Sequence, residues 1–277
     1  MNPGNKLVRR SGLLLISLIA VNLCLCRITQ GGDGIEEGDR FFQAGRYSES
    51  ADRYYAAYLV SPAGKRAAEA LVKTGRSLDL AVRNLYEAAD AACYLNKKRD
   101  EANPGCFEAA VADLNRRFGE GAFSYHGDQV QFSYNATHFR RVLSEFPGSP
   151  YQGEASLMML RGGALLQDDP DAVCRKVEDW IQMYPKSSSM PKALLLLGRL
   201  HADAFVLFKK GAFIVVGGKY DREQLPMGAS KHQFKGLEAF QSILDKYPSS
   251  PEAKIAAREL EILKNGKDDG IFYGISY

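Results

Sequence analysis

The sequence lacks the short motifs that mark most enzyme active sites. It holds no GxxxxGKS or GxxxxGKT phosphate loop, no GxSxG nucleophile turn and no CxxC pair. Its four histidines show no HExxH spacing. We therefore predict a protein that is not an enzyme, with no catalytic residues, no cofactor and no metal site.

Two histidines leave an alternative open. His126 and His232 lie in or near segments without helical periodicity, where they could meet at a metal or ligand site. His201 falls within a helical pattern and is expected to be structural. An enzyme or ligand carrier that uses the irregular segments would depend on the first two histidines coming together.

An excess of charge of one sign is also lacking. The chain has 36 basic and 33 acidic side chains, and Lys6, Arg9 and Arg10 of the first 26 residues account for the formal charge of +3. The remainder is neutral, which gives no electrostatic reason to expect nucleic acid as a partner.

The N-terminus is typical of an export signal. The three basic residues precede an almost uninterrupted apolar run from Leu13 to Cys26, which is short for a membrane span. Cys24 or Cys26 could be a lipidated cysteine, although Leu23 and Leu25 stand where small residues are preferred. Cleavage without lipidation, after Cys26 or near residue 31, and retention as an anchor remain alternatives.

Cysteine is scarce after the signal. Cys93, Cys106 and Cys174 remain, an odd number that excludes a complete disulfide framework. Cys93 and Cys106 flank a turn signal at residues 103–105 and could pair across a helical hairpin in an oxidising compartment. Alternatively, all three are buried thiols.

The most informative feature that is present is a pattern written three times, at residues 139–155, 177–193 and 240–256. Each copy has an apolar residue eight positions before a proline, an aromatic residue just before it and an alanine eight after it. The pattern predicts a helix, a proline stop, a turn and a second helix. The prolines are Pro147, Pro185 and Pro248, with spacings of 38 and 63 residues, so the longer spacing is the same unit with an insert of 25.

These repeats predict an all-α fold: an α-α superhelix, or TPR-like solenoid, of about five helical pairs plus a capping helix. We expect a signal at residues 1–26, a flexible tether at 27–34, the solenoid at 35–264 and a tail at 265–277. Residues 65–101 are expected to form one helical pair with a break near Arg83-Asn84. Two irregular inserts are expected at about 119–134 and 209–228. Gly211–Gly218 in the second has the composition of a strand and could form a short hairpin with part of the first insert.

The repeat resembles the tetratricopeptide units of bacterial envelope proteins, especially BamD-type outer-membrane assembly lipoproteins and CpoB-like periplasmic proteins. The resemblance covers residues 35–62 and 135–264. It implies a scaffold that binds protein partners of the cell envelope in a concave groove lined by the first helices of successive pairs. It also implies an exported protein of the periplasm or the periplasmic face of the outer membrane, associated with the membrane through its N-terminus and possessing a role in outer-membrane protein assembly. A structural adaptor of a secretion, pilus or polysaccharide-export machine is the alternative.

Residues outside the repeat skeleton are the candidates for a partner surface. Tyr54 fits the core pattern, whereas its neighbours are expected to be exposed, and basic doublets flank the first insert. The candidate partner surface therefore comprises Tyr55, Tyr58, Tyr125, Arg116, Arg117, Arg140 and Arg141. A solvated face is the alternative explanation of both doublets, and a loop that simply covers the helices is the alternative for the insert.

Overall fold

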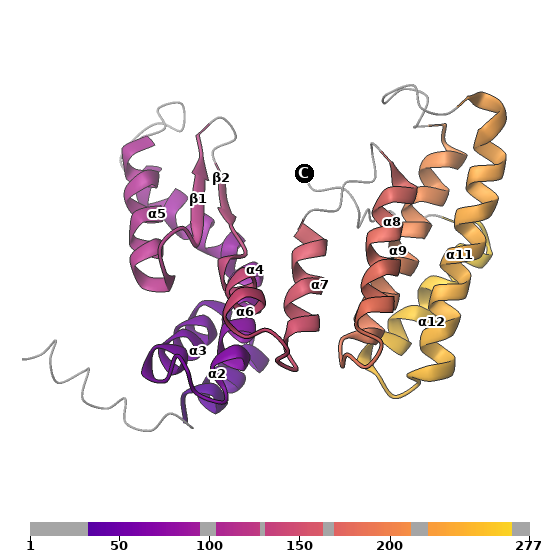
Figure 1. The fold of residues 1–277 in the computed structure, drawn as a ribbon. Coiled ribbons are helices and arrows are strands. Elements are labelled where there is room, and N and C mark those ends of the chain that lie inside the picture. Colours follow the sequence, from indigo (N-terminus) through magenta and orange to yellow (C-terminus); the bar gives the residue numbers. More distant parts are fainter. Residues whose placement is uncertain (1–32, 95–103, 128–130, 163–168, 212–220, 268–277) are drawn as a thin grey trace, which may run out of the picture.

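The computed structural model describes residues 33–94, 104–127, 131–162, 169–211 and 221–267. Within these ranges the chain is almost entirely helical (Figure 1). The elements are α2 (Asp33–Gln43), α3 (Tyr47–Val60), α4 (Ala67–Tyr94), α5 (Pro104–Phe118), β1 (Phe123–His126), β2 (Gln131–Tyr134), α6 (Thr137–Glu145), α7 (Gln152–Gly162), α8 (Pro170–Met183), α9 (Met190–Lys209), the short 3-10 helix η1 (Arg222–Gln224), α11 (Leu225–Lys246) and α12 (Pro251–Lys264).

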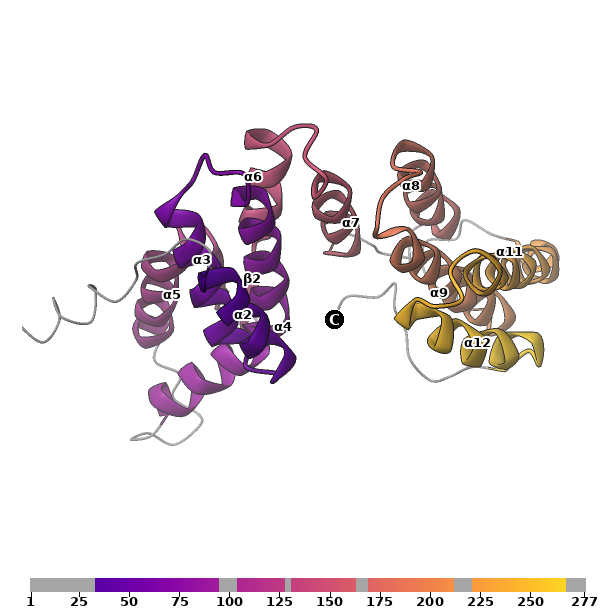
Figure 2. The same cartoon turned by 90° about the horizontal axis from the view of Figure 1, so that it is seen from below.

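The helices pack in pairs along the chain, which confirms the all-α, TPR-like architecture. The pairs are α2 with α3, α4 with α6, α7 with α8, and α9 with α11, while α12 covers the last pair. The first helices of neighbouring pairs also meet, as α4 does with α7. Helix α12 packs against α9 in the same way, at the position of the first helix of a further pair, and we count it as a first helix. Seen from below, α7 lies between the N-terminal helices and the group α8, α9, α11 and α12 (Figure 2).

The repeated pattern forms the same structure each time. Its aromatic residues Phe146, Tyr184 and Tyr247 are the C-caps of α6, α8 and α11, and a proline follows each of them. In every copy the amide of a serine three residues later donates to the carbonyl of the aromatic residue, at 2.9–3.1 Å. Since proline cannot continue a helix and the turn is closed by its own backbone, these boundaries are encoded locally.

The remaining repeat positions form the core. Ala155, Ala193 and Ala256, one from each copy, are completely buried. The apolar core divides into an N-terminal part, built from α2 to α6 and the two strands, and a C-terminal part, built from α8 to α12. Helix α7 belongs to both, because Ala155 packs in the N-terminal part and Leu157 in the C-terminal part. We call these parts the N-terminal lobe and the C-terminal lobe.

Several predicted boundaries differ from the structure. The break near Arg83-Asn84 is wrong, because α4 runs without interruption and Arg83 pairs with Glu87 one turn later, at 2.9 Å. One of the five expected pairs is therefore a single long helix. Helix α2 already begins at Asp33, within the predicted tether, and α11 begins at Leu225, within the second insert. Most of the strand-like Gly211–Gly218 lies outside the described residues.

The first insert was predicted to be irregular, and this is also wrong. It contains an antiparallel hairpin in which Phe123 pairs with Tyr134 and Tyr125 pairs with Phe132. The strands carry the same alternating Phe-Ser-Tyr sequence, which is the period of a strand rather than of a helix. The hairpin packs against α4 and α5, so that α5 and the hairpin together form an excursion between α4 and α6.

Candidate functional site

A groove lies between three first helices, α7, α9 and α12. It has a volume of about 210 Å³ and is lined by Leu157, Met158, Lys192, Leu195, Leu196, Arg199 and Glu252. The helices reach this arrangement because the buried alanines of the repeat let successive pairs approach closely. The groove thus offers aliphatic and charged side chains together, the combination that suits a segment of another protein.

Ion pairs hold the helices of this groove in place. Glu154 on α7 pairs with Arg76 on α4 at 3.3 Å and with Lys192 on α9 at 3.4 Å, so it connects three first helices. Arg199 on α9 binds Glu259 on α12 through both Nε and Nη2, the shorter contact being 2.6 Å. Because Glu259 is 95% buried, this second pair fixes the position of α12 more firmly than a surface pair would.

A second groove lies between α11 and α12 and has a volume of about 460 Å³. Leu237 and Leu260 form part of its lining, and Phe234 at its edge is 67% exposed. Polar side chains, among them Glu238, Gln241 and Lys264, complete it. This groove is formed by the last two helices of the described solenoid.

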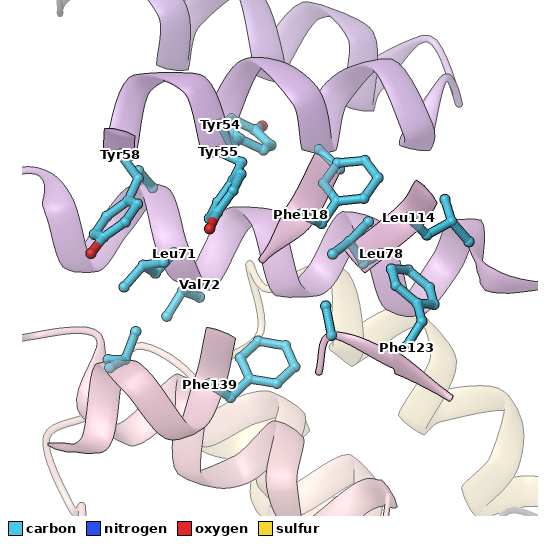
Figure 3. Packing of buried hydrophobic residues seen from close by; sticks show 14 of the residues in the cluster. Tyr54, Tyr55, Tyr58, Leu71, Val72, Leu78, Leu114, Phe118, Phe123 and Phe139 are labelled. Carbon is cyan, nitrogen blue, oxygen red and sulfur yellow. The ribbon is translucent and has the colours of Figure 1, made fainter. Parts of the chain in front are cut away.

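The structure does not assemble the predicted partner surface, and the predicted exposure of two of its tyrosines is wrong. Tyr55 and Tyr58 are only 8% and 5% exposed and point into the N-terminal lobe (Figure 3). Helix α3 has neighbours on two sides, because α5 and α6 cover the face that α2 and α4 leave free. The ring of Tyr55 meets Phe118 of α5 and His138 of α6, with ring centroids 6.5 and 5.2 Å apart.

Two of the four arginines of the basic doublets make long-range contacts with α3. Arg117 binds Asp52, with Nε 2.6 Å from Oδ1, and Arg141 donates to the hydroxyl of Tyr58 while pairing with Glu145. Arg116 and Arg140 are exposed, and Arg116 pairs with Asp113 on its own helix. Each doublet therefore contains one arginine that contacts α3 and one that faces solvent.

The hairpin accounts for the other predicted residues of the first insert. Tyr125 is half-buried and stacks on Phe107, with ring centroids 5.2 Å apart. His126 is exposed at the end of β1 and contacts Ser133 at 2.8 Å. His232 is completely buried on α11 in the other lobe, so the two histidines do not meet (Figure 1). The enzyme or carrier hypothesis loses the pair on which it depended.

Of the three cysteines that follow the predicted signal, two are paired and the third is a buried thiol. Cys93 at the end of α4 and Cys106 in α5 form a disulfide, with their Cα atoms 5.8 Å apart. Cys174 on α8 is a free, buried thiol. The disulfide connects the excursion to the helix from which it departs.

The C-terminal lobe holds a cluster of metal-binding side chains that the sequence did not predict. Cys174 of α8, His201 of α9 and His232 of α11 offer nitrogen and sulfur atoms that all lie within 4.8 Å of one another. Burial lowers the pKa of His201 to about 3 and that of His232 to about 4, and it raises the pKa of Cys174 to about 12. The three residues are 27 and 31 positions apart on separate helices, so no local motif indicates them.

Comparison with known protein families identifies the family of the chain. Residues 115–266, more than half of the chain, match the model of the YfiO family, described as an outer membrane lipoprotein. The chain belongs to the YfiO family. No significant match occurs among curated proteins.

The YfiO match covers all three copies of the repeated pattern and every helix that lines the two grooves. The chain is thus a BamD-type TPR protein of the bacterial envelope. Within the described residues, no helix has the length and apolar character needed to cross a bilayer. The predicted signal and its cysteines, Cys24 and Cys26, lie outside the described residues.

Proposed function

We propose that this YfiO-family protein is a non-catalytic scaffold that binds protein partners during the assembly of outer-membrane proteins. One observation carries the proposal: the groove of α7, α9 and α12 lies wholly within the part of the chain that matches the family. First helices line it, as expected of a solenoid that binds its partner on the inner side of its repeats.

The lining of the groove supports a peptide-like or helical partner. Leu157, Leu195 and Leu196 provide apolar surface, while Lys192 and Arg199 on one side and Glu252 on the other provide charges of both signs. Such a surface favours binding of a segment that presents aliphatic side chains at its centre and charged groups at its edges. Affinity would come from the apolar contacts and orientation from the charges.

We further propose that the protein is exported and held at the periplasmic face of the outer membrane by a lipid on Cys24 or Cys26. The family description and the apolar run before these cysteines support this. Separate Cys24→Ser and Cys26→Ser variants test it by fractionation. The protein should leave the membrane fraction when the modified cysteine is replaced and stay there when the other is replaced.

Site-specific photo-crosslinking in intact cells tests the partner proposal. A photoreactive amino acid at Lys192 or Glu252 would face the groove, whereas one at Arg83, whose side chain is 85% exposed on α4, provides a control outside it. Components of the outer-membrane assembly machinery should be captured from the groove positions and not from Arg83.

Other captured proteins would change the conclusion. Pilus, secretin or polysaccharide-export components would indicate the structural adaptor instead. If the groove positions capture the same proteins as Arg83, or none from the envelope, the scaffold proposal is wrong for this groove.

A further inference from the structure

Three side chains with metal-binding chemistry meet inside the C-terminal lobe. Cys174, His201 and His232 are 2%, 1% and 0% exposed, and each comes from a different helix. The Nδ1 atoms of the two histidines lie 2.8 Å apart, and the Cys174 Sγ lies 3.5 Å from the Nδ1 of His201. Two ring nitrogens and a sulfur are thus directed at one another from three sides.

The hydrogen bonds of this cluster are incomplete without a further atom. A neutral imidazole carries one N–H, so the contact between the two Nδ1 atoms uses the proton of one ring and the lone pair of the other. That leaves one ring without a proton on its Nε2. Both Nε2 atoms are buried, and neither has a hydrogen-bond partner. Buried polar atoms without partners are uncommon, and each one calls for a physical reason.

We propose that Cys174, His201 and His232 form a binding site for Zn²⁺ or a chemically similar transition-metal ion. In this arrangement the Cys174 thiolate and the Nδ1 lone pairs of both histidines bind the metal. The Nε2 of each ring then carries the proton. A small ion lies roughly 2.0–2.3 Å from nitrogen and sulfur ligands, so ligand atoms arranged tetrahedrally around it lie roughly 3.3–3.6 Å apart. The Sγ–Nδ1 separation of 3.5 Å matches this spacing. The two Nδ1 atoms, 2.8 Å apart, would separate by roughly half an ångström to admit the ion.

A carboxylate lies near the Nε2 atom of each histidine, which needs a hydrogen-bond acceptor once it carries the proton. His232 Nε2 lies 3.5 Å from Asp171 Oδ1, and His201 Nε2 lies 4.0 Å from Glu178 Oε1. Metal-binding histidines commonly donate their other N–H to a carboxylate, which orients the ring and strengthens its bond to the metal. Lys231 and Lys235 hold the two carboxylates by ion pairs of 2.7 Å. A small inward movement of each acid would complete both donor–acceptor contacts.

The donor set selects the class of ion. One thiolate and two imidazoles suit Zn²⁺ and related borderline ions, whereas Mg²⁺ and Ca²⁺ prefer oxygen ligands. Burial disfavours the free thiolate in the metal-free protein, and a bound divalent cation would reverse this by stabilising the thiolate, so that the thiol proton is released to solvent. Three protein ligands leave a fourth position for water or another small ligand.

Metal binding would join helices of two successive pairs. Cys174 belongs to the second helix of one pair, and His201 and His232 belong to the two helices of the next. Helix α9 also contributes Lys192, Leu195 and Arg199 to the groove. The site would therefore stabilise the packing behind the groove without taking part in its surface.

Cobalt and zinc titrations of the full chain test the proposal. A Cys24→Ser/Cys26→Ser background removes the two thiols near the N-terminus. One equivalent of Co²⁺ should give a thiolate-to-cobalt charge-transfer band, and one equivalent of Zn²⁺ should displace it and raise Tm. Cys174→Ser should abolish the band, whereas His126→Gln, at an exposed histidine, should leave it intact.

Two further experiments do not depend on whether Cys174→Ser folds: a variant that keeps all three ligands, and a direct measurement of the atoms around the metal. Asp171→Asn keeps all three metal ligands and should weaken binding by about 10-fold to 100-fold. X-ray absorption on zinc bound to the unsubstituted site should show one sulfur at about 2.3 Å and two nitrogens at about 2.0 Å. The proposal is overturned if zinc shows only oxygen or nitrogen neighbours, if binding is not one per chain, or if folded Cys174→Ser binds Co²⁺ with the same spectrum.

Discussion

The ring of Phe240 on α11 lies directly against Gly198 on α9, so that a methyl group on Gly198 would come within 2.4 Å of the ring atom Cε1. The same relationship recurs in two other pairs, where Phe139 lies against Gly75 and Tyr54 against Gly38. In each case a glycine of the first helix accepts an aromatic ring from the second. The contact sets how closely the two helices of a pair approach.

Gly198→Ala should therefore destabilise the protein, although alanine is normally the better residue within a helix. Overpacking in a rigid core costs about 1–3 kcal/mol, more than the roughly 1 kcal/mol of helix propensity gained. Urea denaturation monitored by circular dichroism measures the difference in the free energy of unfolding. Combining the change with Phe240→Leu should recover part of the loss, and strictly additive losses would show that the two residues do not press on each other.

Replacing Arg199 with methionine should cost about 2 kcal/mol of stability. The buried Glu259 carboxylate would lose its shortest ion pair and keep the longer contact with Arg258, at 3.4 Å. The double variant Arg199→Met/Glu259→Leu should lose less than the single one, since it removes the stranded charge. The exposed pair Arg83–Glu87 provides the control, and Arg83→Met should cost less than about 1 kcal/mol. Equal losses at Arg199 and Arg83 in chemical denaturation would contradict the structural role of the buried pair.

The disulfide between Cys93 and Cys106 should stabilise the N-terminal lobe. It closes a loop with a sequence separation of 13 residues, for which chain-entropy arguments give about 3 kcal/mol. Cys93→Ser/Cys106→Ser should lower Tm, and peptide mass spectrometry without reduction should find the two cysteine peptides joined in the parent chain. A parent chain whose unfolding is insensitive to reductant would argue against a stabilising bond.

Acid should destabilise the N-terminal lobe through His138. Burial, with a further contribution from Arg141, lowers the pKa of His138 to about 4, whereas the unfolded chain has a value near 6.5. Between these values the unfolded state binds the additional proton, so the stability present above pH 6.5 is lost as pH falls towards 4. The slope for one group is about 1.4 kcal/mol per pH unit.

The control for this prediction is His138→Gln. Over this range the free energy of unfolding of the variant should depend less on pH, because its unfolding takes up as much as one proton fewer. Every other group contributes equally to both proteins. Denaturation curves at several pH values measure the two slopes. Parallel slopes would show that His138 does not hold its depressed pKa in the folded protein.

The features that were predictable from the sequence are those that short segments determine. A C-capping aromatic residue, a proline and a backbone-closed turn specify the end of one helix and the start of the next within a few residues, as at Phe146-Pro147. The helical pairs, the buried alanines and the family resemblance all follow from this local pattern. The Phe-Ser-Tyr sequence of each strand is a local signal as well, because its alternation has the period of a strand.

The features that escaped prediction depend on contacts between distant segments. Tyr55 and Tyr58 are buried because α5 and α6, more than 40 residues further along the chain, cover the second face of α3. The meeting of Cys174, His201 and His232 depends on the packing of three helices. Periodicity within one helix cannot reveal whether a second face is covered.

The excursion between α4 and α6 also has a consequence for the order of folding. Most pairs in a solenoid join neighbouring segments, and such local contacts form quickly. Helix α4 instead pairs with α6, and the chain between them, from Tyr94 to Thr137, contains α5 and the hairpin. We therefore expect the C-terminal lobe to acquire its native contacts first, and the closing of α6 onto α4 to be the slow step that completes the N-terminal lobe.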